Sequence, residues 1–383
     1  MHWLTRISLS IAFTGALTGS LLAQYPGLTL PPSGKNQKAV VTQFIGPVRV
    51  SIEYSSPAVH GPDGKDRRGQ IWGKLVPYGM EESNGFGNGK AFPWRAGANE
   101  NTVFQVSEDV EIEGKTLPAG RYGLHMIPGQ DEWTIIFSKN SSSWGSFFYD
   151  PADDALRVTV KPHKNDYREW LTYEFTERKP AQATAELQWE ELAVPIGIKV
   201  NNISDLYFTR LQRELTSVPG FSYQGYMAAA QYCLNSNSHL DEGLKWADDA
   251  INRPFIGQKN FNTLNVKAMI LAKMGKQDEA AALMKTAIHD PTASPTDIHQ
   301  FGRQLLAQKK TAEAVEVFKY NAEKNGDTWP THVGLMRAYV ATGEKAKALE
   351  QAKIALGQAP DPLNKKSLED AVQKLSAGET IDQ

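Results

Sequence analysis

The feature that most constrains this chain is a short segment that recurs at a fixed interval in its C-terminal half. Residues 275–280 (GKQDEA) return in related form at 309–314 (KKTAEA) and at 343–348 (GEKAKA), so successive copies begin 34 residues apart. Such an interval accommodates two helices and their turns, and stacked repeats of this size bury one another's apolar faces. The interval therefore predicts an all-α helical repeat domain, an architecture whose extended surfaces usually bind other proteins.

Small residues recur at the same interval. Ala280, Ala314 and Ala348 end the three segments, and a small side chain at such a position lets the two helices of one repeat pack closely. Together with apolar residues at matching positions, this pattern resembles the tetratricopeptide family. A weaker copy at 241–251 raises the expected number of repeats to three or four. The resemblance implies a groove that takes a protein or peptide partner.

The N-terminal half has the pattern of β-strands instead. About ten short runs alternate apolar and polar residues between turn residues, which is typical of an antiparallel sandwich. Alternation predicts that Trp133 and Trp189 face the core, and that Gln188 and Glu190 face solvent. The runs are Val40–Ile45, Val48–Tyr54, Thr102–Val106, Val110–Leu117, Arg121–Ile127, Trp133–Ser138, Leu156–Val160, Leu171–Thr176, Thr184–Glu190 and Ala193–Val200.

Three blocks of this half carry a second resemblance. Ile71–Gly79, Trp94–Thr102 and Leu117–Leu124 resemble an exported bacterial family catalogued as domain of unknown function 2911 (DUF2911). The most specific block is Trp-Arg-Ala-Gly-Ala-Asn-Glu at 94–100. The chain departs from the family pattern by an insertion at 80–93. The resemblance implies a β domain and supplies no activity.

The first 23 residues have the pattern of a signal peptide. Arg6 precedes an apolar run, Ile7–Leu22, and Ala23 ends it before a polar stretch. Cleavage near Ala23 predicts a periplasmic or secreted protein, and no later stretch is apolar enough to cross a membrane. The predicted parts are a signal peptide at 1–23, a linker at 24–36, a β-sandwich-like domain at 37–200, a connecting helix at 201–220 and a helical repeat domain at 221–375.

Composition excludes several classes of protein. The net charge of −2 gives no basic surface for nucleic acid, and a single cysteine, Cys233, allows no disulfide within the chain. The sequence has no recognisable catalytic, phosphate-binding or dinucleotide motif, and its histidines lack the spacing of metal ligands. We therefore assign no catalytic residue, no metal ligand and no cofactor.

Polar residues gather in the long loop before the third predicted strand. Arg95 and Asn99 can donate hydrogen bonds to ligand oxygens, and Glu100 can accept one, which would make a ligand site. The alternative, which we favour, is that Arg95 and Glu100 tie the loop to the sandwich while Asn99 forms a turn.

Four further residues are candidates for the same site. His125 lies on the face of its strand opposite Leu124 and Met126, and we expect it to be solvated there. Trp94, Trp144 and Tyr78 lie in loops, where aromatic rings beside polar groups suit sugar stacking or a peptide groove. The alternative for these rings, again favoured, is that they close the ends of the sandwich.

These observations favour an exported, non-enzymatic binding or scaffolding protein. Its repeats would hold a protein or peptide, and its β domain would hold a second ligand, of which a glycan is one candidate. One alternative is a cell-envelope hydrolase with Glu100 and His125 as acid–base groups. Another is that the β domain is purely structural.

Overall fold

The computed structural model describes residues 36–82, 85, 87 and 89–381. The chain forms two compact units, one ending at Asn201 and the other beginning at Asn202. The predicted signal peptide and all but the last residue of the predicted linker lie outside the described residues.

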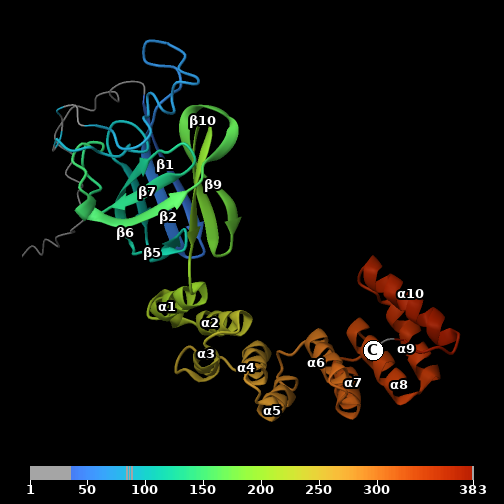
Figure 1. Cartoon of the computed structure of the whole chain (residues 1–383). Coiled ribbons are helices and arrows are strands. Elements are labelled where there is room, and N and C mark those ends of the chain that lie inside the picture. Colours follow the sequence, from blue (N-terminus) through green and yellow to red (C-terminus); the bar gives the residue numbers. More distant parts are fainter. Residues whose placement is uncertain (1–35, 83–84, 86, 88, 382–383) are drawn as a thin grey trace, which may run out of the picture. The chain divides into compact units, whose positions relative to one another are not determined.

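The N-terminal unit consists of two antiparallel β-sheets (Figure 1). The larger sheet has the order β1-β2-β3-β6-β7-β8 and the smaller one the order β5-β4-β10-β9. The strands are β1 (Gln37–Ile45), β2 (Val48–Ser56), β3 (Thr102–Val106), β4 (Val110–Ile112), β5 (Lys115–Leu117), β6 (Gly120–Ile127), β7 (Trp133–Ser138), β8 (Asp154–Val160), β9 (His163–Lys179) and β10 (Gln182–Lys199). A 3₁₀ turn, η1 (Pro151–Asp153), precedes β8.

Aromatic side chains join the inner faces of the two sheets. Tyr54 of β2 meets Tyr173 of β9 edge to face, with ring centroids 4.8 Å apart. Trp133 of β7 and Trp189 of β10 are both almost fully buried, and the ring of Trp72 lies 5.1 Å from the first and 5.6 Å from the second. Edge-to-face contacts of this kind add to the stabilisation from apolar burial. The predicted antiparallel sandwich-like domain is confirmed, and so is the core position of both tryptophans.

Several predicted strands had wrong bounds. The predicted strand at 110–117 is a hairpin, because Glu113 and Gly114 take positive φ angles of 49° and 77° and turn the chain between β4 and β5. The two predicted strands at 184–190 and 193–200 form one strand, β10, whose register with β9 shifts around Glu190, which has a φ of 56°. A bulge of this kind bends a long strand without ending it.

The predicted exposure of Gln188 and Glu190 was also wrong, since only 4% and 8% of their surfaces are exposed. A loop covers this side of β10, and the carboxylate of Glu190 accepts a hydrogen bond from the backbone N–H of Gly69. Strand alternation correctly separates the two faces, but it does not reveal that a distant loop covers the outer one.

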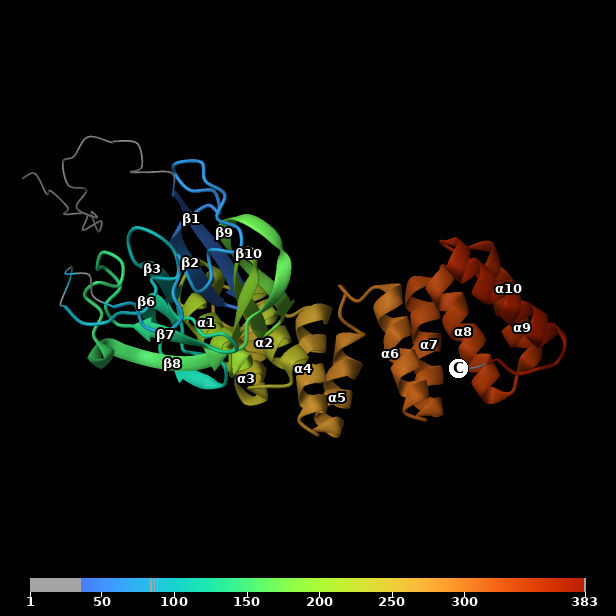
Figure 2. The same ribbon diagram turned by 45° about the horizontal axis from the view of Figure 1, so that its top comes forward.

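The C-terminal unit is all-helical in its described part, and its helices follow one another as successive pairs (Figure 2). The helices are α1 (Ile203–Glu214), α2 (Tyr223–Ser236), α3 (Leu240–Asn252), α4 (Phe261–Lys273), α5 (Gln277–Ala287), α6 (Pro295–Ala307), α7 (Thr311–Asn325), α8 (Trp329–Thr342), α9 (Lys345–Gly357) and α10 (Pro362–Ser376). A 3₁₀ turn, η2 (Val218–Phe221), lies between α1 and α2.

The first helix begins without a side-chain cap. It starts directly after Asn202, so Ser204 lies within its first turn. Asn202 has a φ of 49° and makes no side-chain capping hydrogen bond. A serine near a helix start is a common cap, and here the chain's left-handed entry at Asn202 sets the boundary instead.

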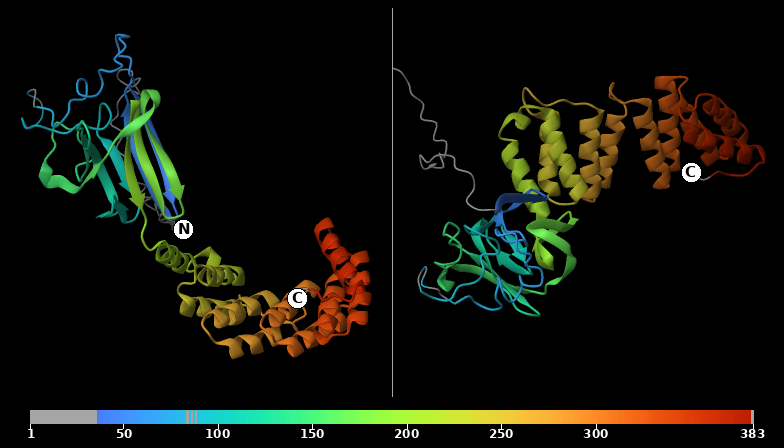
Figure 3. Two further views of the ribbon diagram at one scale, coloured as in Figure 1. Left: turned by 45° about the vertical axis from the view of Figure 1, so that its right-hand side comes forward. Right: turned by 90° about the horizontal axis from the view of Figure 1, so that it is seen from above.

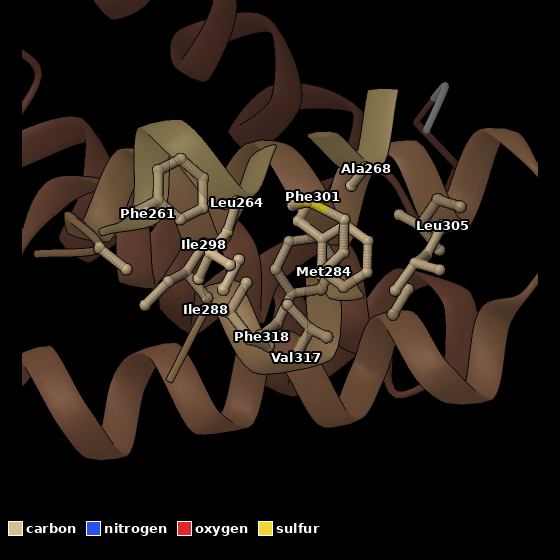
Figure 4. Close-up of a cluster of buried hydrophobic side chains, with 14 of the residues drawn as sticks. Phe261, Leu264, Ala268, Met284, Ile288, Ile298, Phe301, Leu305, Val317 and Phe318 are labelled. Atoms are coloured by element: carbon tan, nitrogen blue, oxygen red, sulfur yellow. The ribbon is translucent and has the colours of Figure 1, made fainter. Parts of the chain in front are cut away.

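Close packing between helices depends on the recurring small residues. Ala280, Ala314 and Ala348 are buried, the last two completely. The ring of Phe318 on α7 lies against Gly302 of α6 and Gly334 of α8, so close that a Cβ at either glycine would overlap it. Figure 4 shows Phe318 within a continuous apolar cluster that also contains Phe261, Leu264, Met284 and Phe301. The predicted helical repeat architecture is confirmed.

The turn between the two helices of a repeat has the same backbone conformation in three repeats. Gly275, Lys309 and Gly343, spaced 34 residues apart, all take left-handed conformations, with φ angles of 83°, 61° and 79°. Glycine adopts this conformation freely, whereas a residue with a Cβ does so at an energetic cost. Of these three residues, only Lys309 has a Cβ, so only at Lys309 does this conformation have an energetic cost.

Candidate functional site

The three polar loop residues of the β unit do not join in one cluster. Arg95 donates a hydrogen bond to the carbonyl oxygen of Asn99 at 2.7 Å, and its guanidinium lies over the ring of Phe147, 4.9 Å from the centroid. Burial lowers the pKa of Arg95. The carboxylate of Glu100 instead accepts a hydrogen bond from Ser55 at 3.2 Å. Asn99 has a φ of 58°, as a turn residue would. Arg95 thus stabilises its own loop.

The position of His125 contradicts the expectation of a solvated side chain. Only 1% of its surface is exposed, because the segment at 143–149 covers this face of β6. Its Nδ1 lies 2.7 Å from the hydroxyl of Ser146, and its ring meets that of Tyr149 edge to face at 5.6 Å. Burial, with a smaller effect from Arg95, lowers the pKa of His125 to about 4. The imidazole is therefore neutral near pH 7.

The candidate aromatic residues divide into one half-buried ring and two exposed rings. Trp94 packs against Trp72 with ring centroids 5.8 Å apart and stacks near Trp189 at 6.4 Å, so its ring belongs to the core cluster. Trp144 and Tyr78 remain 52% and 45% exposed. One face of the Tyr78 ring lies against Gly73, where a Cβ would overlap it. Only Trp144 and Tyr78 therefore present substantial ring surface to solvent.

The sequence did not point to the residues that surround His125. Ser146 is 1% exposed, and Tyr149, 4% exposed, donates a hydrogen bond to Asp154 at 2.9 Å. Arg157 donates to both Tyr149 and Asp154, which fixes the end of β8 against this segment. Burial is the main cause that raises the pKa of Tyr149. A run of small and aromatic residues in a loop gives no sequence signal for such a network.

The open clefts of greatest interest lie in the helical unit. One cleft of about 490 Å³ is formed by α6, α8 and α10, three alternate helices of the stack. Figure 3 shows the helices of this unit following one another in the stack. Its walls include Trp329, Val333, Met336 and Leu368, which give apolar surface. Its polar and charged lining residues are Thr296, His299, Gln300, Arg303, Arg337, Asn364, Ser367, Asp370 and Lys374. We call it the α6/α8/α10 cleft.

Several polar atoms of this cleft have no partner. Nine buried side-chain nitrogen or oxygen atoms lack a hydrogen bond in the described part of the chain. Three of them, Nδ1 of His299, Nε1 of Trp329 and Nε of Arg337, belong to residues that line the cleft. His299 turns its Nδ1 toward Gly334. Because an unpaired buried polar group is costly, the nitrogens of Trp329 and Arg337 favour an acceptor from a water or a bound group.

Electrostatic effects accompany this arrangement. Burial lowers the pKa of Arg337, and the nearby positive charge of Arg303 lowers it further. Burial also lowers the pKa of His299 to about 4, with smaller effects from Arg337 and Arg303. His299 is therefore neutral near pH 7, and the positive charge of the cleft belongs to its arginines and lysine.

A second cleft, of about 720 Å³, lies at the start of the helical unit. It is lined by residues of α1, η2, α2 and α3 and of the loop that follows α3. Phe221 and Phe255 are 78% and 107% exposed there, and Phe255 takes a φ of 68°. Charges of both signs line it, including Glu242, Asp249 and Arg253, so it has no single electrostatic character.

Two kinds of feature are absent from the described residues. They contain no group of three or more His, Cys, Asp or Glu side chains that could hold a metal ion. They also contain no helix whose length and apolar character suit a membrane span.

Cys233 is buried, and its pKa is raised to about 11, mainly by that burial.

The fold defines a modular protein in which a two-sheet β domain is followed by a stack of helix pairs. Residues 36–198 match the model of a family described as "Protein of unknown function (DUF2911)". The β unit is therefore a domain of this family, as the three sequence blocks indicated.

Comparison with solved structures gives distant similarities. YrrB, described as a TPR (tetratricopeptide repeat) protein with an unusual peptide-binding site, is 17% identical, with a TM-score of 0.30 over 44% of this chain and 89% of YrrB. TTC0263, a TPR protein of Thermus thermophilus, is 18% identical, with a TM-score of 0.32 over 46% of this chain and 91% of that one. MamA from Desulfovibrio magneticus is 16% identical, with a TM-score of 0.29 over 40% and 93%. No curated protein matches the chain.

Proposed function

We propose that this chain is an exported, non-enzymatic binding protein whose helical unit holds a segment of another protein. The observation that carries the proposal is the α6/α8/α10 cleft. Alternate helices of the stack line it, so it follows the repeat direction and can receive an extended or helical segment. Its volume of about 490 Å³ falls in the range of ordinary ligand sites.

The lining of the cleft suits a protein segment. Apolar side chains such as Val333 and Leu368 can cover apolar side chains of a partner, while the unpaired nitrogens of Trp329 and Arg337 can donate to its backbone or side-chain oxygens. Binding sites in proteins combine apolar walls with a few polar groups in this way.

The geometry gives no support to a hydrolase. His125 is buried and neutral near pH 7, and its hydrogen-bonding partner is Ser146 rather than Glu100. A general acid–base pair must reach the substrate atoms whose protons it moves. A side chain with 1% of its surface exposed does not meet that requirement.

The proposal can be tested by panning a library of displayed random dodecapeptides against the full-length chain. We expect the chain to enrich a family of related peptides, and the double substitution Gln300→Trp and Ser367→Trp to abolish the enrichment. Both residues are exposed and line the cleft, so two indoles would fill it. Lys353→Trp is the matched control, because Lys353 is exposed on α9 and lines none of the described clefts.

Enrichment by the wild-type chain and the Lys353→Trp control, lost only in the double variant, would support the proposal. Absence of any enrichment, or equal enrichment by all three proteins, would refute it. Circular dichroism of each variant shows whether the helices are retained.

The proposal of export depends on the sequence at the N-terminus. Arg6, the apolar run Ile7–Leu22 and Ala23 favour removal of the first 23 residues. Expression of the full-length chain in a bacterial host, followed by N-terminal sequencing of the periplasmic fraction, tests this point. We expect the mature chain to begin at Gln24, and an uncleaved cytoplasmic product would refute export.

For the β unit we propose a second ligand that stacks on exposed aromatic surface, with a glycan as the candidate. Trp144 is 52% exposed and stands next to Gly145, against which Arg95 packs. A glycan array probed with the full-length chain should give signals that Trp144→Ala removes and Trp170→Ala retains, since Trp170 is 40% exposed elsewhere. An array without signals would leave the β unit with a structural role only.

A further inference from the structure

We propose that the α6/α8/α10 cleft selects acidic protein segments. This inference rests on the proposed function and adds the chemistry of the partner to it. It follows from the charges that line the cleft and from the absence of ion-pair partners for its arginines among the described residues.

The charged residues of the cleft are mostly positive. Arg303 of α6 and Arg337 of α8 stand 34 residues apart, the repeat interval, and Lys374 of α10 lines the same cleft. Asp370 is the single carboxylate among the lining residues. Three positive side chains and one negative side chain therefore face one space, although the whole chain has a net charge of −2.

The two arginines are not neutralised by the protein itself. In the part of the chain that the structure describes, neither Arg303 nor Arg337 forms an ion pair, and Nε of Arg337 has no hydrogen-bond acceptor. Each instead lies in the positive field of the other, which lowers the pKa of Arg337. A guanidinium group forms its strongest hydrogen bonds with carboxylates, often in pairs. A ligand carboxylate would supply the missing acceptors and relieve the repulsion.

The surroundings favour a protein segment over a nucleic acid. Nucleic-acid binding relies on an extended basic surface that follows a phosphate backbone. Here the positive side chains are few, Asp370 interrupts them, and Trp329, Val333 and Leu368 stand among them. Such a mixture fits a segment in which Asp or Glu alternates with apolar residues.

The test compares three pools of displayed dodecapeptides that carry glutamate, glutamine or lysine at every third position and random residues elsewhere. The full-length chain should retain the glutamate pool about tenfold more strongly than the glutamine pool. Arg303→Gln and Arg337→Gln should each remove most of this preference. Lys353→Gln removes the same charge from exposed α9 and should leave the preference unchanged.

The outcomes separate the two proposals. Equal retention of the glutamate and glutamine pools, or an equal loss of preference in Lys353→Gln, would refute the selection of acidic segments while leaving peptide binding intact. Retention of no pool would refute both. A fluorescein-labelled oligothymidylate that binds as well as the glutamate pool, and loses binding with the same arginines, would show that the cleft recognises anions of another class and would overturn the inference. Arg303 is exposed, so Arg303→Gln does not threaten the fold.

Discussion

At the scale of single residues, one position of backbone strain in the described chain is at the turn of the α6–α7 pair. Lys309 holds a φ of 61° at the position where the neighbouring repeats have Gly275 and Gly343. We predict that Lys309→Gly stabilises the helical unit by about 1 kcal/mol, because glycine adopts a left-handed conformation without the steric cost of a Cβ. Urea unfolding followed by circular dichroism measures this change. A loss of stability would mean that the Lys309 side chain makes a favourable contact.

The burial of His125 leads to a prediction for how the stability of the β unit depends on pH. Its pKa is about 4 in the folded chain, against an ordinary value of 6.5, so the unfolded chain binds a proton more readily. The stability of the β unit should therefore be intact above pH 6.5 and fall as the pH is lowered from 6.5 toward 4, by up to roughly 3 kcal/mol.

His125→Gln should remove this contribution to the pH dependence, whatever its effect on stability at neutral pH. The measurement is the urea midpoint of the β unit at several pH values, followed by tryptophan fluorescence. Identical slopes for the wild type and His125→Gln between pH 6.5 and pH 4 would show that His125 becomes protonated as easily in the folded chain as in the unfolded one.

At the scale of the elements, helix pairing depends on small residues. Ala314 is completely buried where α7 meets its partner, so Ala314→Leu should destabilise the helical unit by roughly 1–3 kcal/mol through overpacking. Ala312→Leu lies on the exposed side of the same helix and should cost little. Thermal unfolding of both variants tests the prediction, and equal melting temperatures would contradict it.

Elements also show how far the sequence could predict this fold. The 34-residue interval was sufficient for the helices, since each repeat contacts its sequence neighbours and the apolar pattern reports that contact directly. The alternation of apolar and polar residues likewise identified the inner faces of β7 and β10, because apolar positions along a strand report directly which face is buried. It could not predict the burial of His125 or Glu190, because segments far along the chain, at 143–149 and around Gly69, cover those faces.

The candidate sites show the same difference between features set by residues close in sequence and features set by distant ones. The sequence suggested that Arg95 and Glu100 together tie the loop to the sandwich, whereas Arg95 bonds to the carbonyl oxygen of Asn99, four residues away, and Glu100 accepts from Ser55. The α6/α8/α10 cleft could not be found from the sequence, because its residues come from three helices and none of them forms a motif. The interval between Arg303 and Arg337 was the single available signal, and charged residues on exposed helix faces are too common for it to stand out.

At the scale of the whole molecule, the chain consists of two units with separate cores. We predict two calorimetric unfolding transitions for the full-length chain, because each unit has a core of its own and can unfold as a separate cooperative domain. Ala314→Leu should lower the temperature of one transition only. A single transition that shifts as a whole would show that the two cores unfold cooperatively.

The central claim is that the α6/α8/α10 cleft holds a protein segment, and photo-cross-linking tests it most directly. The full-length chain would carry p-benzoylphenylalanine in place of Gln300, or in place of Lys353 as the control, and would be irradiated with the glutamate-containing peptide pool. The account predicts that the peptide pool is cross-linked at position 300 and little at position 353. An excess of a competing peptide that lacks the detection tag should suppress the cross-links at position 300. Equal cross-linking at both positions, or none at position 300 while peptide remains bound, would contradict it.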